Sequence, residues 1–367
     1  MDAIEMLPRL LRAAYAEDIK AFDDAVLLLG RKLKKDYPKI SDEIIAIAAN
    51  RKVGANIYRS IDFNSLPIDK ESRDNLLDVE EPMMVIDPIL SISVRSQFDD
   101  FIQERHLINE FLEEGIVPSN SILLYGRPGV GKTYSARWLA DKLRMPLVTV
   151  DLAATMSSYL GKSGQNIKSI FDFAKNKNVV LFLDEIDAIA KRRDDESDLG
   201  ELKRLVNVLL KELDDLPINC VVIGATNHPE LLDRAIWRRF DRVIELDMPA
   251  HEERKALFER ELGQYVSELV VMNFLVENTD NVSASEICKL CTHIKRQIIM
   301  NKSNDVNIIA IKEICKFVNI SGKEGKKQLC KKLKDLSVKI TIKQISEITG
   351  VSVASVNRYL KGENLER

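Results

Sequence analysis

The chain has 367 residues, 45% of them hydrophobic and 30% charged, and a net charge of −3. This composition supports two or three domain cores and excludes a disordered or collagen-like chain. The near balance of charge also excludes a general polyanion binder. No stretch reaches the roughly 18 apolar residues of a membrane span, and the N-terminus lacks a basic-then-apolar signal pattern. We therefore expect a cytoplasmic protein without membrane contact.

The five cysteines are too few for a disulfide scaffold. Cys288 and Cys291, with His293 nearby, would make half a metal site. The second Cys-x-x-Cys pair of a zinc site is absent from the sequence. We expect these cysteines to be ordinary buried thiols.

The spacing of apolar residues and prolines predicts five regions. We expect a helical N-terminal domain (1–60), a linker (61–90), an α/β nucleotide-binding domain (91–250), a helical lid (251–318) and a basic C-terminal module (319–367). The C-terminal module carries 11 basic and 5 acidic residues, a net charge of +6, so the rest of the chain carries −9.

Within the predicted α/β domain, apolar runs alternate with amphipathic helical runs. We expect strands at 121–126, 146–151, 179–184, 219–227 and 243–249, and helices at 98–115, 132–143, 166–177 and 201–216. This alternation predicts a mostly parallel sheet with right-handed crossovers, which places the fold in the α/β class.

Residues 126–133 read GRPGVGKT and fit the phosphate-loop pattern G-x-x-x-x-G-K-[ST], between a predicted strand and a predicted helix. Glycines let backbone N–H groups point at phosphate oxygens, and the helix N-terminus adds partial positive charge. We expect Lys132 to reach the β- and γ-phosphates and Thr133 to bind Mg²⁺. The alternative, a glycine-rich turn that binds nothing, is disfavoured by the complete pattern in this context. The expected nucleotide contacts are Gly126, Pro128, Gly129, Val130, Gly131, Lys132, Thr133 and Tyr134.

Two acidic residues follow the apolar run VVLFL and end the predicted strand 179–184. An acid at the carboxyl end of a parallel strand lies where ligands bind in open α/β sheets. Asp184 fits a ligand of Mg²⁺, and Glu185 fits a general base that orients the attacking water. A solvated acidic turn is the alternative, and the phosphate loop makes it less favoured.

Asn227 ends another buried strand, where it would hydrogen-bond the γ-phosphate or the attacking water. Arg238 and Arg239 follow eleven residues later, and arginine stabilises charge that develops on a transferring phosphoryl group. In isolation this Arg-Arg pair would indicate a surface ion-pair cluster. The order of the motifs favours a catalytic role.

These motifs together resemble the AAA branch of the AAA+ ATPases over roughly 90–318. GRPGVGKT resembles its Walker A motif, LFLDEID its Walker B motif, and ATNHPELLDRAIWRRFD its sensor-1 and arginine-finger region. The resemblance implies a P-loop NTPase sheet with a helical lid, ATP and Mg²⁺ as ligands, and a ring of subunits, usually a homo-hexamer. It also implies Asn227 as sensor 1, and Arg238 and Arg239 as fingers that act on a neighbour's ATP.

The stretch SSYLGKSGQNI (157–167) resembles the first pore loop of this family, in which Tyr159 and Leu160 would grip an unfolded polypeptide. The alternative is that Tyr159 is a core residue. The stretches LDEIDAIAKRRDD, LGELKRLVNVLL and ATNHPELLDRAIWRRFD also resemble bacterial AAA ATPases that have a helical N-terminal region. Such proteins are often found beside a subtilisin-like serine protease, and some appear in anti-phage settings, so the resemblance implies such a protease as a partner.

The C-terminal stretch TIKQISEITGVSVASVNRYLKGEN (341–364) has the spacing of a helix-turn-helix, with Gly350 at the turn and Ser352 as a helix cap. It would either bind DNA or dock against protein. Two main hypotheses follow: an ATP-hydrolysing ring that remodels or unfolds a protein, and an ATP-regulated DNA-binding switch that uses this module. A scaffold that binds ATP without turnover is a third, which the intact catalytic residues disfavour.

Overall fold

The computed structural model describes residues 76–152, 163–175, 177–189, 199–301, 305–318, 322–336 and 340–361, with a few positions between 26 and 67. The predicted N-terminal domain (1–60) and the predicted pore residues Tyr159 and Leu160 therefore lie largely or wholly outside the described residues. None of the helices in the described ranges is long and apolar enough to cross a membrane.

One six-stranded sheet forms the centre of the nucleotide-binding domain, with the strand order β1-β3-β4-β5-β2-β6. The strands are β1 (Asp78–Glu80), β2 (Ser121–Tyr125), β3 (Leu147–Asp151), β4 (Val180–Asp184), β5 (Val221–Thr226) and β6 (Arg242–Glu245). Every neighbouring pair is parallel except β1 and β3. The α/β class and the mostly parallel sheet predicted from the sequence are confirmed.

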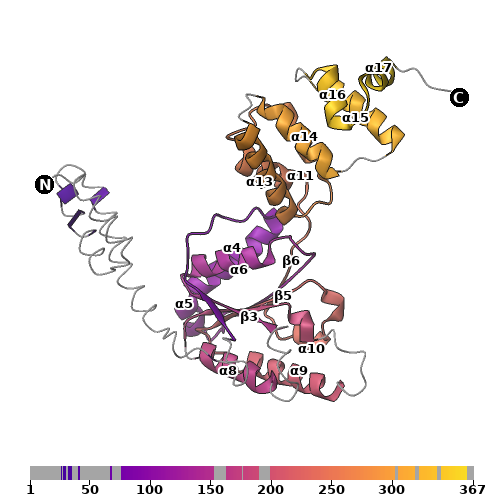
Figure 1. The fold of residues 1–367 in the computed structure, drawn as a ribbon. Coiled ribbons are helices and arrows are strands. Elements are labelled where there is room, and N and C mark those ends of the chain that lie inside the picture. The colour runs from indigo at the N-terminus through magenta and orange to yellow at the C-terminus, as the bar shows by residue number, and fades with distance from the viewer. Residues whose placement is uncertain are drawn as a thin grey trace.

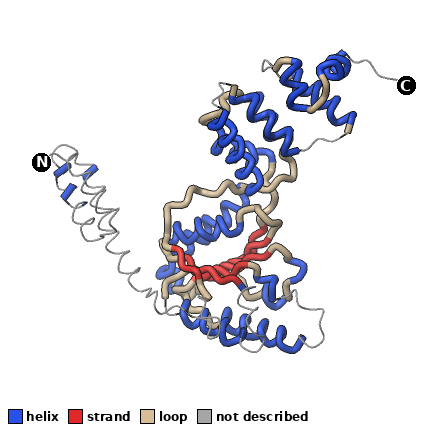
Figure 2. Tube along the Cα trace, viewed as in Figure 1, coloured by secondary structure: helices blue, strands red, loops and turns tan. Residues whose placement is uncertain are grey.

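Helices cover both faces of this sheet, as Figures 1 and 2 show. On one face, Phe98 of α4 and Trp138 of α6 belong to the core that includes Phe182 of β4. On the other face, Phe171 of α8 and Leu209 of α9 pack in a second core. The helices of this domain are α4 (Ile92–His106), α5 (Ile108–Glu113), α6 (Lys132–Leu143), α8 (Ser163–Lys175), α9 (Leu199–Asp214) and α10 (Arg234–Trp237), with 3₁₀ turns η3 (Ile186–Ile189) and η4 (Pro229–Leu231). Strands buried on both faces explain the apolar runs of β4 and β5.

Two local differences from the prediction concern segments before the phosphate loop. The predicted linker (61–90) contains β1, which adds an antiparallel edge to β3. The predicted helix 98–115 is two helices in the structure, because α4 ends with Leu107 as its C-cap and α5 begins after the same residue. Helix α4 also begins earlier than predicted, after its N-cap Ser91. Gly115 follows α5 with a φ of 73°, a left-handed conformation that suits glycine at a helix end.

Four helices follow the sheet and are called the lid here: α11 (His251–Leu262), α12 (Leu269–Glu277), α13 (Ala284–Asn301) and α14 (Val306–Val318). Three more form the C-terminal module: α15 (Lys323–Asp335), α16 (Ile342–Thr349) and α17 (Val353–Lys361). A single hydrophobic core includes Leu257 and Ile314 of the lid and Leu333, Ile345 and Val356 of the module. Figure 1 shows the module beyond the lid, at the end of the molecule away from the sheet.

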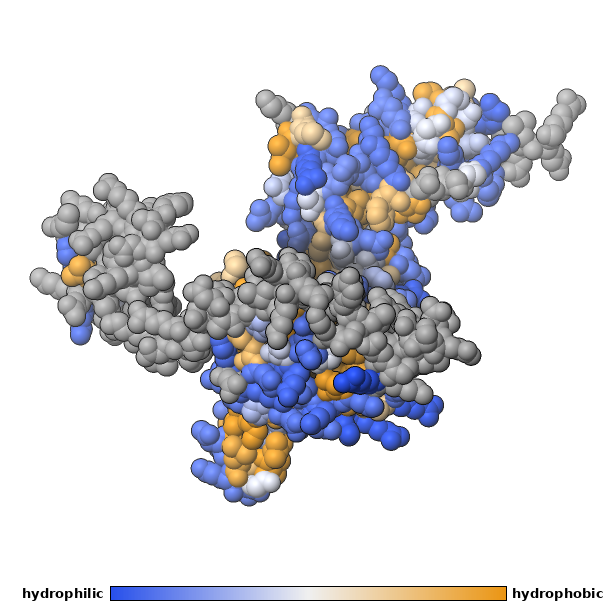
Figure 3. All heavy atoms as spheres, turned by 60° about the horizontal axis from the view of Figure 1, so that its bottom comes forward, coloured by the Kyte–Doolittle hydropathy of each residue, from blue (hydrophilic) through white to orange (hydrophobic). Residues whose placement is uncertain are grey.

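The cysteines are reduced, and four of the five are buried, whereas Cys288 is partly exposed. His293 contacts Glu313 at 3.0 Å. Across the described residues there is no cluster of three or more potential metal ligands. Hydrophilic residues predominate on the face shown in Figure 3, with apolar residues in smaller groups.

Candidate nucleotide-binding site

The phosphate loop runs from the end of β2 to the start of α6, as the sequence predicts. Gly126 has a φ of 147°, and a Cβ there would collide with the carbonyl oxygen of Leu246. Gly131 is the N-cap of α6 with a φ of 109°. Both positions need glycine, because other residues rarely adopt a positive φ. The loop can therefore bring its backbone N–H groups close to an anion at the helix N-terminus.

The Lys132 side chain is buried at the start of α6, and its ammonium has three acceptors. Its Nζ donates to the carbonyl oxygens of Gly126 at 2.7 Å and Arg127 at 3.1 Å, and to Asn227 Oδ1 at 2.7 Å. Burial lowers the pKa of Lys132, and the negative charges of Asp184 and Asp187 oppose that shift. The cation is thus held among loop carbonyls, where phosphate oxygens could replace some of its partners.

Asp184 and Glu185 lie at the carboxyl end of β4. The Asp184 carboxylate accepts a hydrogen bond from the Glu185 backbone N–H at 2.9 Å. Burial raises the pKa of Asp184, against the lowering effects of that hydrogen bond and of Lys132. Glu185 is exposed and has a φ of 50°, an uncommon conformation for a residue with a side chain. Backbone strain of this kind concentrates at functional sites.

The donor set beside the loop fits Mg²⁺. The Thr133 side chain lies close enough to Asp184 to lower the pKa of that carboxyl, so the two predicted metal ligands are neighbours. Hydroxyl, carboxylate and water oxygens are the ligands that Mg²⁺ prefers, usually with phosphate oxygens of the substrate. A bound Mg²⁺ would neutralise charge on the phosphates. Thr133 and Asp184 are the residues that would hold it.

Polar residues at the end of β5 complete this side of the site. Thr226 donates to the buried carboxylate of Asp187 at 2.9 Å and accepts from the His228 backbone N–H at 2.9 Å. These two bonds fix the backbone on either side of Asn227. Asn227 therefore lies where the ends of β2 and β5 meet, with its side-chain oxygen on Lys132.

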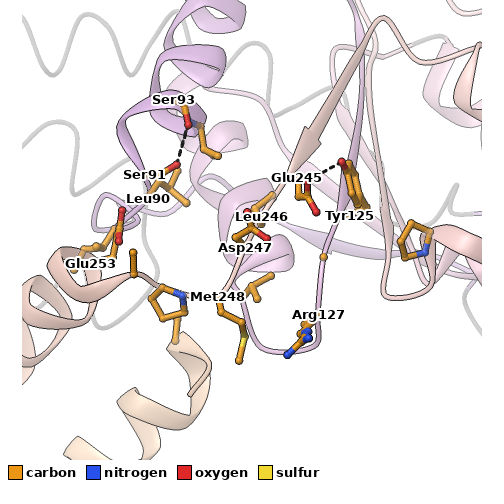
Figure 4. A pocket seen from close by; sticks show the side chains of 18 of the residues that line it. Leu90, Ser91, Ser93, Tyr125, Arg127, Glu245, Leu246, Asp247, Met248 and Glu253 are labelled. Carbon is orange, nitrogen blue, oxygen red and sulfur yellow. Dashed lines mark hydrogen bonds between the residues drawn. The ribbon is translucent and has the colours of Figure 1, made fainter. Parts of the chain in front are cut away.

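A cavity of about 1120 Å³ opens beside the loop. Figure 4 shows side chains from the segment before α4, from β2, from β6 and from α11 around it. Its wall includes Gly126, Val130 and Asn227 among the predicted site residues. The other predicted loop contacts, Pro128, Gly129, Gly131, Lys132, Thr133 and Tyr134, continue the chain from these residues but do not line the cavity. The Tyr134 hydroxyl instead donates to the carbonyl oxygen of Ile86 at 2.7 Å.

The cavity has an apolar part that the sequence motifs do not indicate. Ile89, Leu90, Val130, Met248 and Ala284 all line it. They come from the segment before α4, the loop, the segment after β6 and the start of α13, so only the fold brings them together. An apolar wall next to a phosphate loop suits the flat, apolar faces of a nucleobase.

The lid contacts the phosphate loop directly at the N-terminus of α13. The Ser285 backbone N–H donates to the carbonyl oxygen of Gly129 at 3.0 Å. Ser283 and Glu286 cap this helix: the Ser283 hydroxyl donates to Glu286 Oε2 at 2.7 Å, and the Glu286 N–H donates to Ser283 Oγ at 3.3 Å. A nucleotide that changes the conformation of the phosphate loop would therefore act on the lid directly, through the hydrogen bond between Gly129 and Ser285.

Arg238 and Arg239 lie apart from the loop, after the short helix α10. Both are exposed, and neither lines the cavity. Arg239 Nε pairs with Asp214 Oδ1 of α9 at 2.8 Å, whereas Arg238 has no ion pair within the described part of the chain. Among the described residues, neither arginine forms a hydrogen bond or an ion pair with Lys132, Asp184 or Asn227.

Residues 122–248 match the family described as "ATPase family associated with various cellular activities (AAA)". An AAA family ATPase of Sinorhizobium fredii, y4kL, is 33% identical over 244 residues, which cover 66% of this chain and 73% of that protein. The chain belongs to the AAA family of ATPases. Membership in this family implies ATP binding and hydrolysis, which fits the loop, the acids and the cavity.

The chain is also similar to a second relative in sequence and to a solved structure in fold. A proteasome-activating nucleotidase of Archaeoglobus fulgidus is 35% identical over 240 residues, which cover 62% of this chain and 60% of the nucleotidase. The AAA chain thus spans less than two thirds of that relative. The crystal structure of the FIGL-1 AAA domain aligns with a TM-score of 0.52 at 20% identity, over 80% of this chain and 94% of that one. At that identity the likeness shows the fold alone.

Proposed function

We propose that the protein is a Mg²⁺-dependent ATPase that assembles into a ring, a homo-hexamer by resemblance to its family, and remodels or unfolds a protein. One observation supports the ring most strongly. Lys132, Asp184, Glu185 and Asn227 gather at the ends of adjacent strands, whereas Arg238 and Arg239 are exposed after α10 and form no hydrogen bond or ion pair with them. Exposed arginines that do not contact the site of their own chain are available to complete the site of a neighbouring subunit.

In this proposal each group has a defined task in hydrolysis. Lys132 exchanges loop carbonyls for phosphate oxygens, and Thr133 and Asp184 hold Mg²⁺. Glu185 accepts a proton from the attacking water, and Asn227 orients that water or the γ-phosphate. Arg238 and Arg239 of the adjacent subunit stabilise the charge that develops on the phosphoryl group.

The proposal of a protein substrate is supported by the similarity to a proteasome-activating nucleotidase and by the resemblance of 157–167 to a pore loop. Tyr159 and Leu160 would contact the polypeptide. An unfolded protein such as α-casein should then stimulate ATP hydrolysis, and Tyr159→Ala should lose that stimulation. Tyr265→Ala, which removes an exposed lid tyrosine, is the matched control and should retain it. No stimulation of the wild type by casein, or equal stimulation of the wild type and Tyr159→Ala, would contradict the proposal.

On the resemblance alone, we propose a subtilisin-like serine protease as partner, in an anti-phage setting. A Glu185→Gln trap loaded with ATP and used as bait in cells tests both the substrate and this partner. The proposal expects such a protease and a bound substrate in the captured material. Capture of substrate without any protease would remove the partner and leave the remodelling function intact.

A second candidate function is an ATP-regulated DNA-binding switch, and the geometry of the C-terminal module favours it. Helices α16 and α17 are joined by Gly350 in the left-handed conformation, with φ 65° and ψ 25°. This short turn between two helices is the arrangement in which a helix-turn-helix presents its second helix to DNA. A gel-shift experiment with the full chain and duplex DNA, with and without ATP, tests this function separately from protein remodelling.

A further inference from the structure

The turn between α16 and α17 is fixed by specific bonds. The Ser346 hydroxyl donates to the carbonyl oxygen of Val351 at 2.6 Å, across the turn. Thr341 and Gln344 form a capping box at the start of α16. Ser352 Oγ accepts from the Ser355 backbone N–H at 3.3 Å, which confirms its predicted role as the cap of α17. The two helices thus have a defined relative orientation.

Packing decides which side of α17 is available to a partner. Val356 is fully buried, and Tyr359 and Leu360 pack against the core that the module shares with the lid. The opposite side carries an outward-facing stripe formed by Val353, Ala354, Asn357, Arg358 and Lys361, of which Asn357 is half-buried and the others exposed. Each of these residues lies three or four positions from another member of the set, as in the pairs 353/357, 354/358 and 358/361, so they form one continuous helix face.

The charge of the module complements a polyanion. Exposed lysines and Arg358 lie on α15, α16 and α17, in a region with a net charge of +6 on a chain that is otherwise acidic. Lys326 of α15 lies beside the turn, because its Nζ is 3.9 Å from the place where a Cβ on Gly350 would stand. Of the three acids in the described module, Glu324 and Asp335 are exposed on α15, and Glu347 of α16 lines a cavity of about 430 Å³ against α13 and α14 of the lid. Glu347 thus lies on the side of the module that faces the lid, whereas Lys326 lies beside the turn.

We propose that this stripe on α17 enters the major groove of duplex DNA, with Lys326 against the phosphate backbone beside the turn. This assignment rests on the second candidate function and not on ATP hydrolysis. The stripe combines an amide and a guanidinium, which recognise base edges, with apolar Val353 and Ala354, which suit the thymine methyl group. Because the module shares its core with the lid, a movement of the lid would carry this surface with it.

The test uses the full chain and a fluorescein-labelled 24-base-pair DNA duplex of mixed sequence, followed by fluorescence anisotropy at several salt concentrations. The wild type should bind with micromolar affinity at low salt, and binding should weaken steeply as salt rises. Arg358→Ala should weaken binding about tenfold. Lys326→Ala should reduce the slope of log K against log salt by about 1. Arg296→Ala, which removes an exposed arginine from the lid helix α13, is the matched control and should leave affinity within about twofold.

A duplex RNA of the same sequence separates groove reading from general attraction to phosphate. The major groove of A-form RNA is too deep and narrow for a helix, so the RNA should bind more weakly than the DNA. An equal loss of DNA affinity in Arg358→Ala and Arg296→Ala, or equal affinity of the wild type for RNA and DNA, would contradict the assignment of α17 to the major groove. Either result would still leave DNA binding by the chain in place. No binding of DNA at low salt would overturn the DNA function too and leave protein docking as the role of the module.

Discussion

Lys132 Nζ and Asn227 Oδ1 lie 2.7 Å apart, and this hydrogen bond joins the start of α6 to the end of β5. The bond exists because β2 and β5 are neighbouring parallel strands, so the residues that follow them emerge at the same edge of the sheet. The group that would bind phosphate and the group that would sense it are therefore already in contact.

Substitution of Asn227 should separate these two roles. Asn227→Ala should slow ATP hydrolysis roughly a hundredfold and leave ATP affinity within about threefold, because Lys132 still binds the phosphate oxygens. Lys132→Ala should abolish ATP binding, since the phosphates lose their counter-charge. Calorimetric titration and a phosphate-release assay measure the two effects, and Asn219→Ala, before the other end of β5, is the control. An affinity loss in Asn227→Ala as large as in Lys132→Ala would refute the division of roles.

Glu185→Gln should bind ATP with nearly unchanged affinity and hydrolyse it about a thousandfold more slowly, because the amide cannot accept the proton of the attacking water. The amide has the same shape, so the left-handed backbone at residue 185 is under the same strain in both proteins. Single-turnover hydrolysis measures the effect, with Glu277→Gln on the lid as control. Turnover at the wild-type rate would remove Glu185 from the mechanism.

Mixed assemblies test the position of the arginines. The double variant Arg238→Ala/Arg239→Ala has an intact phosphate loop but lacks both arginines. The Lys132→Ala variant keeps both arginines, but its phosphate loop cannot bind ATP. Each alone should be nearly inactive, and a mixture should recover part of the turnover, because some double-variant sites then face a Lys132→Ala neighbour. Of the single variants, Arg239→Ala should also lower Tm slightly, since Arg239 loses its pair with Asp214. A mixture with no more activity than its parts would contradict the shared site.

The burial of Asp184 predicts a pH-dependent change in stability. Its pKa is raised above 3.8, so the native state binds this proton more tightly than the unfolded chain. The ionised carboxylate therefore costs stability, with no cost below pH 3.8 and the full cost once the pH exceeds the folded-state pKa. Without nucleotide, Asp184→Asn should raise Tm by about 2 °C at pH 8, and the gain should shrink as the pH falls. An Asp184→Asn variant that is less stable than the wild type at pH 8 would contradict the prediction that the ionised carboxylate lowers stability.

The sequence predicts the regular part of this fold well and its edges poorly. The helix 132–143 has its predicted bounds, because the phosphate loop fixes its start and an apolar face fixes its extent. The strand β1 was missed because three mixed residues carry no periodic signal. The break between α4 and α5 at Leu107 was also missed, because helical apolar spacing continues through it.

The same limit applies to the site. The motifs predict Lys132, Asp184 and Asn227 as neighbours, because the carboxyl ends of parallel strands share one edge. They do not predict the apolar cavity wall of Ile89, Met248 and Ala284, which three separate segments supply. Nor do they indicate that Arg239 pairs with Asp214 while Arg238 lacks a partner within the described residues, since that depends on how α9 packs against α10.

The central claim is that an active site needs two subunits. ATP turnover per chain, measured over a thousandfold range of protein concentration with saturating Mg·ATP and with sedimentation velocity at each point, tests it most directly. We predict that turnover per chain falls to near zero where the protein is monomeric and rises in step with assembly. Full turnover per chain in monomeric protein would contradict the account.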